Sequence, residues 1–314
     1  MNSSNLYGYA GRALRVDLTS GRIIHEALDE PILRKYLGGT TLGMKFLYEE
    51  VPPGVEWFAP NNRLFLGSGP LGGTSVPGSG TIAVITKGAL TNGSSATQAN
   101  GFFGAYLRHC GFDCIIIQGA APDWVYLHIH DGTAELREAN HLRGKDMQEM
   151  GELIREEIGR EKRQVSVLGI GPAGENLVKF AAICVDNGHF AAHNGVGAVM
   201  GSKKLKAVVV DRGKGTIPLK NREGFSKAAK EILEALKADR YYSDIAAHGT
   251  LGAMKILRKW GALPVKNYTT NLLNIDEDRF AKYTPEYIES HFEIKLNPCW
   301  ACQAHHSQIM KCTE

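Results

Sequence analysis

Short apolar runs separated by glycine and proline fill the first two-thirds of the chain. Runs of this kind are typical of buried strands, whereas apolar positions three or four residues apart are typical of helices. We expect strands at residues 14–18, 63–66, 82–86, 114–118, 124–129, 165–168 and 207–210. Helices are expected at residues 29–36, 42–50, 102–110 and 147–158. Because strands and helices do not alternate strictly, the pattern predicts an α+β fold with layered β-sheets over residues 1–212.

The last third of the chain has a different character. Of the 36 glycines, 30 lie in residues 1–212 and 6 in residues 213–314, so we place a domain boundary between these ranges. Amphipathic helices are expected at residues 223–237 and 251–260, where apolar side chains recur at helical spacing. The sequence therefore predicts a mostly helical second domain over residues 213–314.

Composition excludes several classes of protein. A content of 43% hydrophobic residues is enough for a packed core, and 36 basic against 33 acidic residues leave a net charge of only +3. This balance gives no support for nucleic-acid binding. The first residues show no secretion signal, and no apolar run is long enough to span a membrane. We therefore expect a cytoplasmic protein that binds neither nucleic acid nor membrane.

Cysteines are sparse except near residue 314. Of the six cysteines, Cys299, Cys302 and Cys312 lie in the last sixteen residues, and His306 lies among them. The Cys-x2-Cys spacing places two thiolates on one tight turn, which is a common arrangement for metal ligands. By spacing alone, a zinc site, an iron–sulfur cluster and ordinary structural thiols all remain open.

A glycine motif near residue 170 resembles a dinucleotide-binding fingerprint. Gly169, Gly171 and Gly174 follow an apolar run, as in the loop that places a pyrophosphate at a helix N-terminus. However, Pro172 interrupts the loop, and no acidic residue follows at the position that would bind the ribose. We therefore disfavour an NAD-dependent dehydrogenase and expect the segment to shape a turn.

Longer motifs carry a resemblance to a known family. They occupy residues 7–12, 14–18, 36–39, 69–75, 103–107, 169–207 and 263–268, together with the cysteine motif at residue 299. In these motifs the chain resembles the aldehyde:ferredoxin oxidoreductases, and the resemblance covers nearly the whole chain. Because members of that family are longer, we expect this chain to be an N-terminal half that is inactive without the C-terminal half of the same enzyme.

The resemblance also implies an activity and its cofactors. Such enzymes hold tungsten or molybdenum between two pterins, beside a [4Fe–4S] cluster. They oxidise aldehydes to carboxylates and pass the electrons to ferredoxin or another iron–sulfur carrier. A related aromatic acyl-CoA reductase uses the same scaffold, and a non-catalytic zinc-binding or degenerate relative is a further alternative. No catalytic residue is assigned.

Individual site residues follow from the same resemblance. The cluster ligands are expected at Cys299 and Cys302, with His306 in place of the third cysteine and Cys312 as a substitute. The cofactor-binding residues are expected at Thr81, Gln98, Ala99, Asn100, Gly101, His189, Phe190, Ala191, His193, Asn194 and Gly195.

The expected pterin site has fewer positively charged side chains than the corresponding site of the family. At Thr81, His189 and His193, relatives commonly carry arginine, which is a strong phosphate ligand. An alternative for part of this set is purely structural. Gln98 and Asn100 are also placed to cap the helix expected at residue 102.

Overall fold

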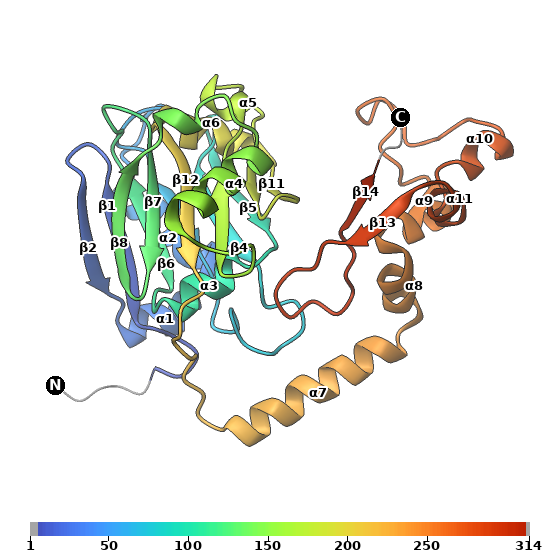
Figure 1. Cartoon of the computed structure of the whole chain (residues 1–314), viewed down its shortest axis with the longest axis horizontal. Helices are drawn as coiled ribbons and strands as arrows, with labels where there is room; N and C mark the ends of the chain where they lie inside the picture. Colours follow the sequence, from blue (N-terminus) through green and yellow to red (C-terminus); the bar gives the residue numbers. More distant parts are fainter. Residues whose placement is uncertain (1–5, 312–314) are drawn as a thin grey trace. The chain divides into compact units, whose positions relative to one another are not determined.

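The computed structural model describes residues 6–311, which divide into two compact units (Figure 1). The first unit contains residues 6–75 and 79–222, and the second contains residues 76–78 and 223–311. Residues 213–221, which follow the boundary expected from the sequence, form neither helix nor strand. They stay with the first unit because the N–H of Gly215 donates to the His109 carbonyl (3.0 Å) and the N–H of Gly8 donates to the Pro218 carbonyl (2.7 Å).

Across residues 6–311, the first unit contains two six-stranded mixed sheets. The first sheet has the order β2 (Arg22–Ala27), β1 (Arg12–Asp17), β6 (Cys114–Gln118), β3 (Leu64–Gly67), β4 (Ile82–Lys87) and β5 (Ser94–Ala99). The second has the order β11 (His189–Ala191), β10 (Ile183–Val185), β9 (Val165–Gly169), β12 (Leu205–Asp211), β7 (Val125–His130) and β8 (Thr133–Glu138). The α+β class predicted from the sequence is confirmed.

Helices cover the sheets of the first unit. They are α1 (Glu30–Tyr36), α2 (Gly39–Glu50), α3 (Phe103–His109), α4 (Met147–Ile158), α5 (Pro172–Glu175) and α6 (Val196–Ser202), with 3-10 turns η1 (Asn140–Leu142) and η2 (His193–Gly195). Helix α2 packs Leu42 and Phe46 against Phe65 and Ile85 of the first sheet. Helix α6 contacts strands of both sheets, and all of its apolar residues are buried. The core of the unit therefore lies on both faces of the first sheet.

The second unit is mostly helical. Its helices are α7 (Arg222–Ala238), α8 (Arg240–His248), α9 (Met254–Lys259), α10 (Glu277–Ala281) and α11 (Pro285–His291), and η3 (Gly249–Ala253) is a 3-10 turn. The strands β13 (Glu293–Leu296) and β14 (Gln308–Lys311) form an antiparallel hairpin. The sequence analysis did not predict this hairpin, and its loop contains the cysteine motif.

Several expectations about single elements can be compared with the structure. All seven strands expected in residues 1–212 are present, and α4 has the expected bounds. The helix expected at residues 251–260 is wrong in part, because its first turn belongs to η3 and only α9 is α-helical. Gly252 packs closely there, since a Cβ would lie 3.0 Å from the carbonyl oxygen of Asp244.

The glycine motif near residue 170 lies outside any dinucleotide-binding unit. Strand β9 pairs antiparallel with both β10 and β12, whereas a dinucleotide fold needs parallel strands around the loop. The helix after the motif, α5, spans only Pro172–Glu175. A Cβ on Gly174 would lie 3.1 Å from the carbonyl oxygen of Gly197 in α6, so the glycine here allows a close helix contact.

Candidate functional site

The edge strands β5 and β11 lie next to each other, although they belong to different sheets (Figure 1). His193 follows β11, and its N–H donates to Thr97 Oγ1 (3.4 Å). Its carbonyl accepts a hydrogen bond from Ser95 Oγ (3.3 Å). Ser95 and Thr97 occupy alternate positions of β5 and therefore point to the same side of the strand. The two segments expected to bind the cofactor are thus brought together.

Four of the expected residues gather at the carboxyl end of β5. Thr81 Oγ1 donates a hydrogen bond to Asn100 Oδ1 (2.9 Å). Gly101 adopts φ +115°, and a Cβ there would lie 2.8 Å from Asp186 Oδ2 and 3.5 Å from His189 Cδ2. Glycine is therefore required at residue 101 because the β10–β11 hairpin approaches so closely.

Two further expected residues lie at the opposite end of β5. Asn194 adopts φ 59°, and its Oδ1 accepts a hydrogen bond from the N–H of Thr91 (2.9 Å). Gly195 follows with φ +69°, where a Cβ would lie 1.9 Å from the carbonyl oxygen of Lys179. The expected residues therefore form a row along β5, over about 20 Å at the usual rise of a strand, rather than one compact cluster.

The expected cofactor-binding residues along β5 differ in their exposure to solvent. Gln98 and His193 are exposed, and 60% of Phe190 is accessible to solvent. Ala99, His189 and Ala191 are buried. Accessible polar groups along β5 are thus amide, hydroxyl and imidazole groups.

Asp186 is a central residue of this region that the sequence analysis missed. Its carboxylate accepts hydrogen bonds from the N–H of Phe102 (2.6 Å), from Ser166 Oγ (2.6 Å) and from the N–H of Val167 (3.2 Å). Desolvation raises the pKa of Asp186 despite these donors. The Asp-Asn-Gly sequence at residues 186–188 is a turn signal that would have drawn attention to it.

Asp186 also decides the capping alternative for α3. The N–H of Phe102, at the start of the helix, donates to Asp186 and not to a nearby side chain. Gln98 Nε2 instead donates to Thr40 Oγ1 (3.4 Å), and Asn100 accepts from Thr81. Capping of α3 by Gln98 or Asn100 is therefore wrong, because both side chains form their hydrogen bonds elsewhere.

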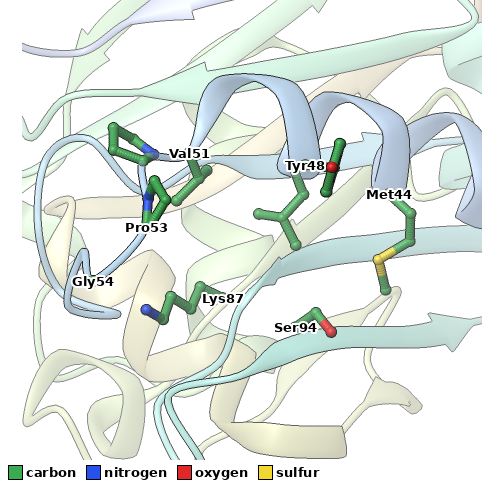
Figure 2. A pocket seen from close by; sticks show the side chains of 9 residues that line it. Met44, Tyr48, Val51, Pro53, Gly54, Lys87 and Ser94 are labelled. Carbon is green, nitrogen blue, oxygen red and sulfur yellow. The ribbon is translucent and has the colours of Figure 1, made fainter.

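A pocket of about 420 Å³ lies beside α2, the C-terminal end of β4 and the N-terminal end of β5 (Figure 2). Met44, Tyr48 and Ser94 line it, and Lys87 extends beneath Val51 and the following prolines. The Lys87 ammonium donates to the carbonyl oxygen of Val55. The expected cofactor-binding residues do not line this pocket, so it is separate from their row.

The cysteine motif occupies the loop between β13 and β14. Cys299 is buried and Cys302 is partly exposed, and the N–H of Cys302 donates to the Cys299 carbonyl (3.2 Å). The loop is closed at its base by the N–H of Asn297, which donates to the Ser307 carbonyl (2.9 Å). Ala301 and His305 adopt positive φ values of 52° and 46°, which curl the backbone around Cys302.

The surroundings of Cys302 favour a thiolate. Its pKa is lowered to about 4, chiefly by a hydrogen bond from the Cys299 side chain. Backbone N–H groups of His305 and Ala304 and the His306 side chain act in the same direction. The thiolate is the form of cysteine that binds metals. Cys299, Cys302 and His306 are therefore grouped in this loop, and Cys312 lies outside the described residues.

The residues present fit the groups that the sequence analysis leads us to expect. A low-pKa thiolate beside a second cysteine suits iron or zinc, and an imidazole is adjacent. Along β5, exposed amide and hydroxyl groups suit the donors and acceptors of a pterin ring. Threonine and histidine at residues 81, 189 and 193 make this surface less cationic than an arginine-rich phosphate site.

Residues 6–311 contain no helix that could span a membrane. None of the helices there combines the length and the apolar character needed to cross a bilayer.

Comparisons with known proteins identify the family. The model of the aldehyde ferredoxin oxidoreductase N-terminal domain matches residues 13–212, and the model of domains 2 and 3 matches residues 227–314. The tungsten-containing aldehyde ferredoxin oxidoreductases of Pyrococcus abyssi and Pyrococcus furiosus are 40% and 38% identical to the chain, each over 95% of it and 48% of the relative. The chain thus spans about half the length of these curated relatives.

A solved structure agrees with this match. The active site complex BamBC of benzoyl coenzyme A reductase, in complex with 1,5 dienoyl-CoA, has a TM-score of 0.84 and 30% sequence identity. It covers 98% of this chain, which in turn covers 48% of that chain. On both the sequence and the structure, the chain belongs to the aldehyde ferredoxin oxidoreductase family.

Proposed function

We propose that this chain is the pterin-binding part of a tungsten- or molybdenum-dependent oxidoreductase that oxidises aldehydes to carboxylates. The observation that carries the proposal is the contact between β5 and β11, which aligns the expected cofactor-binding residues along one strand. Family membership supports the same reading. The cysteine loop supports electron transfer through a [4Fe–4S] cluster to ferredoxin or a similar carrier.

Each group of residues has its own role in this proposal. The metal and its pterins supply the redox chemistry when bound. Thr81, Gln98 and Asn100 orient the pterin rings through hydrogen bonds, and His193 offers an exposed imidazole to a phosphate. Cys299 and Cys302 hold iron through their thiolates, with His306 beside them. Asp186 positions this surface by joining the start of α3 to the β10–β11 hairpin.

The proposed substrate and partners follow from the relatives of this chain. The tungsten-containing relatives act on aldehydes by name, whereas another relative, 36% identical over 243 residues, is an aliphatic sulfonate oxidoreductase, WOR-like subunit of Pyrococcus furiosus. The similarity to the benzoyl coenzyme A reductase complex favours a second candidate, the reduction of an aromatic acyl-CoA. In either case we propose that the other half of the enzyme completes the site, because the chain spans about half of its relatives.

Metal analysis of the anaerobically purified protein tests the proposal. We expect tungsten or molybdenum together with iron, and a loss of tungsten or molybdenum in Asn100→Ala. Asn140→Ala, which changes an exposed asparagine of η1, serves as the matched control. Zinc without tungsten, molybdenum or pterin would instead support the zinc-binding relative.

The role of His306 needs a separate experiment. If its imidazole holds iron, His306→Ala should lower the iron content, whereas His306→Cys should retain iron and lower the cluster potential. His291→Ala changes an exposed histidine of the same unit and should leave both unchanged. Unaltered iron content and an unaltered paramagnetic resonance signal in His306→Ala would exclude His306 as a ligand.

A further inference from the structure

Two histidines and a glutamate converge on the β7–β8 hairpin. His128 and His130 lie two residues apart on β7 and therefore share one face of the sheet. Glu135 on β8 is the register partner of His128. Glu135 Oε1 lies 3.7 Å from His128 Nδ1 and 4.0 Å from His130 Nε2. The ligand atoms of all three side chains lie within 4.8 Å of one another.

Asp211 orients the His128 ring toward this cluster. His128 is buried, with 5% of its side chain exposed, and its Nε2 lies 2.9 Å from Asp211 Oδ1. A proton on Nε2 donates to that carboxylate and leaves the lone pair on Nδ1. Within residues 6–311, Nδ1 is buried and has no hydrogen-bond partner. Such an unpartnered nitrogen is costly in a folded protein, and a carboxylate behind an imidazole is typical of metal-binding histidines.

The charges around the cluster also suit a cation. Glu135, Glu157 and Asp211 bring three carboxylates, whereas Arg137 and Arg160 bring two guanidinium groups. Arg137 contacts Glu135 Oε1 (2.6 Å) and also lies 3.5 Å from Glu157. It can therefore keep Glu157 as a partner when Glu135 turns to a metal ion. The three carboxylates and two guanidinium groups together leave one net negative charge, which a bound cation would balance.

We propose that His128 Nδ1, His130 Nε2 and the Glu135 carboxylate bind one divalent transition-metal ion of the zinc type. Imidazole nitrogen and carboxylate oxygen are ligands that zinc prefers, at about 2.0–2.2 Å. Ligand atoms of a tetrahedral ion are then about 3.3–3.5 Å apart, so the Glu135 carboxylate must move slightly closer to the two ring nitrogens, from 3.7 and 4.0 Å. The two ring nitrogens, which lie within 4.8 Å of each other, must also approach. Three protein ligands leave the fourth position for water.

This site is distinct from the proposed pterin and cluster sites. In the order of the second sheet, β7 and β8 lie at the edge opposite β11. The cysteine loop belongs to the other unit. The metal content of the histidine site therefore does not depend on whether the chain binds tungsten, pterin or iron.

Titration of the whole chain with Zn²⁺, and with Co²⁺ as a spectroscopic probe, tests the proposal. The titration is made in the Cys299→Ser/Cys302→Ser background, so that thiolates do not compete for the metal. We expect one ion per chain, with absorption typical of tetrahedral Co²⁺. His130→Gln and Glu135→Gln should each weaken binding at least about tenfold, and Asp211→Asn by about 10–100-fold. Because His130 and Glu135 are partly exposed, these two changes should leave the thermal melt unchanged.

His141→Gln provides the matched control. His141 is an exposed histidine that also lies near two carboxylates, Glu138 (3.5 Å) and Glu157 (3.3 Å), but outside the cluster. We expect it to leave affinity and stoichiometry unchanged. The proposal is overturned if the chain binds no stoichiometric metal. It is equally overturned if binding survives both His130→Gln and Glu135→Gln, or is lost in His141→Gln.

Discussion

The two units of the chain bury their apolar side chains to different extents. In the first unit, both sheets are covered by helices, and Phe65, Tyr106 and Tyr126 are fully buried. Among residues 223–311, the buried apolar residues other than glycine are Ala229, Ala253, Leu263, Phe280, Pro285, Cys299 and Ala304. In the same range Trp260, Tyr268 and Leu272 are 66%, 75% and 68% exposed.

This difference in burial indicates that the first unit provides most of the stability, whereas the second unit provides an exposed apolar surface. Burial of apolar area is the main favourable contribution to folding, so the first unit contains most of what stabilises the chain. A helical unit with a small core and exposed aromatic side chains has a surface typical of contact with another protein segment. We therefore expect equivalent substitutions to have different effects in the two units.

Cysteine reactivity should show the largest contrast. The pKa of Cys302 is lowered to about 4 mainly by the hydrogen bond from Cys299, whereas desolvation raises the pKa of Cys114 in the core of the first unit. In the metal-free protein at pH 7, iodoacetamide should therefore modify Cys302 faster than Cys114 by at least about a thousandfold. Because the thiolate of Cys302 is already formed, its rate should be flat between about pH 6 and 8. Peptide mass spectrometry, with Cys302→Ser as control, measures both rates, and equal rates would contradict the contrast.

Removal of one aromatic ring from each core should give the next largest difference. Phe65 is 1% exposed and stacks on Phe46 with ring centroids 6.1 Å apart. Phe65→Ala should lower the free energy of unfolding by about 3–5 kcal/mol. Phe280 is 6% exposed beneath the Arg258 guanidinium, and Phe280→Ala should cost less than about 3 kcal/mol. Hydrogen exchange resolved by unit measures each effect, and a larger cost for Phe280→Ala would reverse the comparison.

Two glycines with the same left-handed backbone conformation, one in each unit, can be compared directly. Gly195 and Gly261 have φ values of +69° and +61°. A Cβ on Gly195 would lie 1.9 Å from the Lys179 carbonyl oxygen, whereas on Gly261 the nearest atom, Leu272 Cδ2, would be 3.6 Å away. Gly261→Ala should cost about 1–2 kcal/mol for its backbone conformation. Gly195→Ala should cost a further ~1–3 kcal/mol for overpacking, measured by urea denaturation. Equal costs would show that the η2 region adapts without strain.

Acid sensitivity should give the smallest contrast. Desolvation alone would raise the pKa of Glu50, but hydrogen bonds from Arg15 and Arg63 lower it. The interaction of Glu50 with these two arginines therefore contributes stability above the unfolded pKa, about 4.3, and this stability is lost as the pH falls through the folded pKa. Glu50→Gln should remove about 1–2 kcal/mol at pH 7 and flatten the acid limb of the stability curve.

An exposed glutamate in the second unit is the control for this acid effect. A hydrogen bond from Lys255 lowers the pKa of Glu286 to about 2, but 64% of its side chain is exposed and solvent screens the pair. Glu286→Gln should change stability by only about 0–1 kcal/mol, and less at high salt. Urea midpoints from pH 7 to 3 measure both variants. If both substitutions changed the loss of stability at low pH by the same amount, the expected effect of burial would be contradicted.

Local sequence patterns were sufficient for much of the fold. The long apolar runs predicted the central strands, because a buried strand has to be apolar on both faces. Helix α4 was predicted with its bounds from the helical spacing of its apolar residues, and the structure adds a capping box between Asp146 and Glu149 within the same local sequence. The cysteine spacing likewise predicted that Cys299 and Cys302 share one tight turn, and the N–H of Cys302 donates to the Cys299 carbonyl there.

Contacts between distant residues were decided only by the tertiary structure. Strands β10 and β11 have three residues each, which is too short for a periodic signal, so the sequence did not show that β11 lies beside β5. The bond from Phe102 to Asp186 spans 84 residues, and the bond from His128 to Asp211 spans 83. Such partners are chosen by the packing of whole sheets and not by local propensity. The sequence by itself therefore determined the central strands, the longer helices, the family and the candidate ligands, whereas the fold determined which of those ligands share a site.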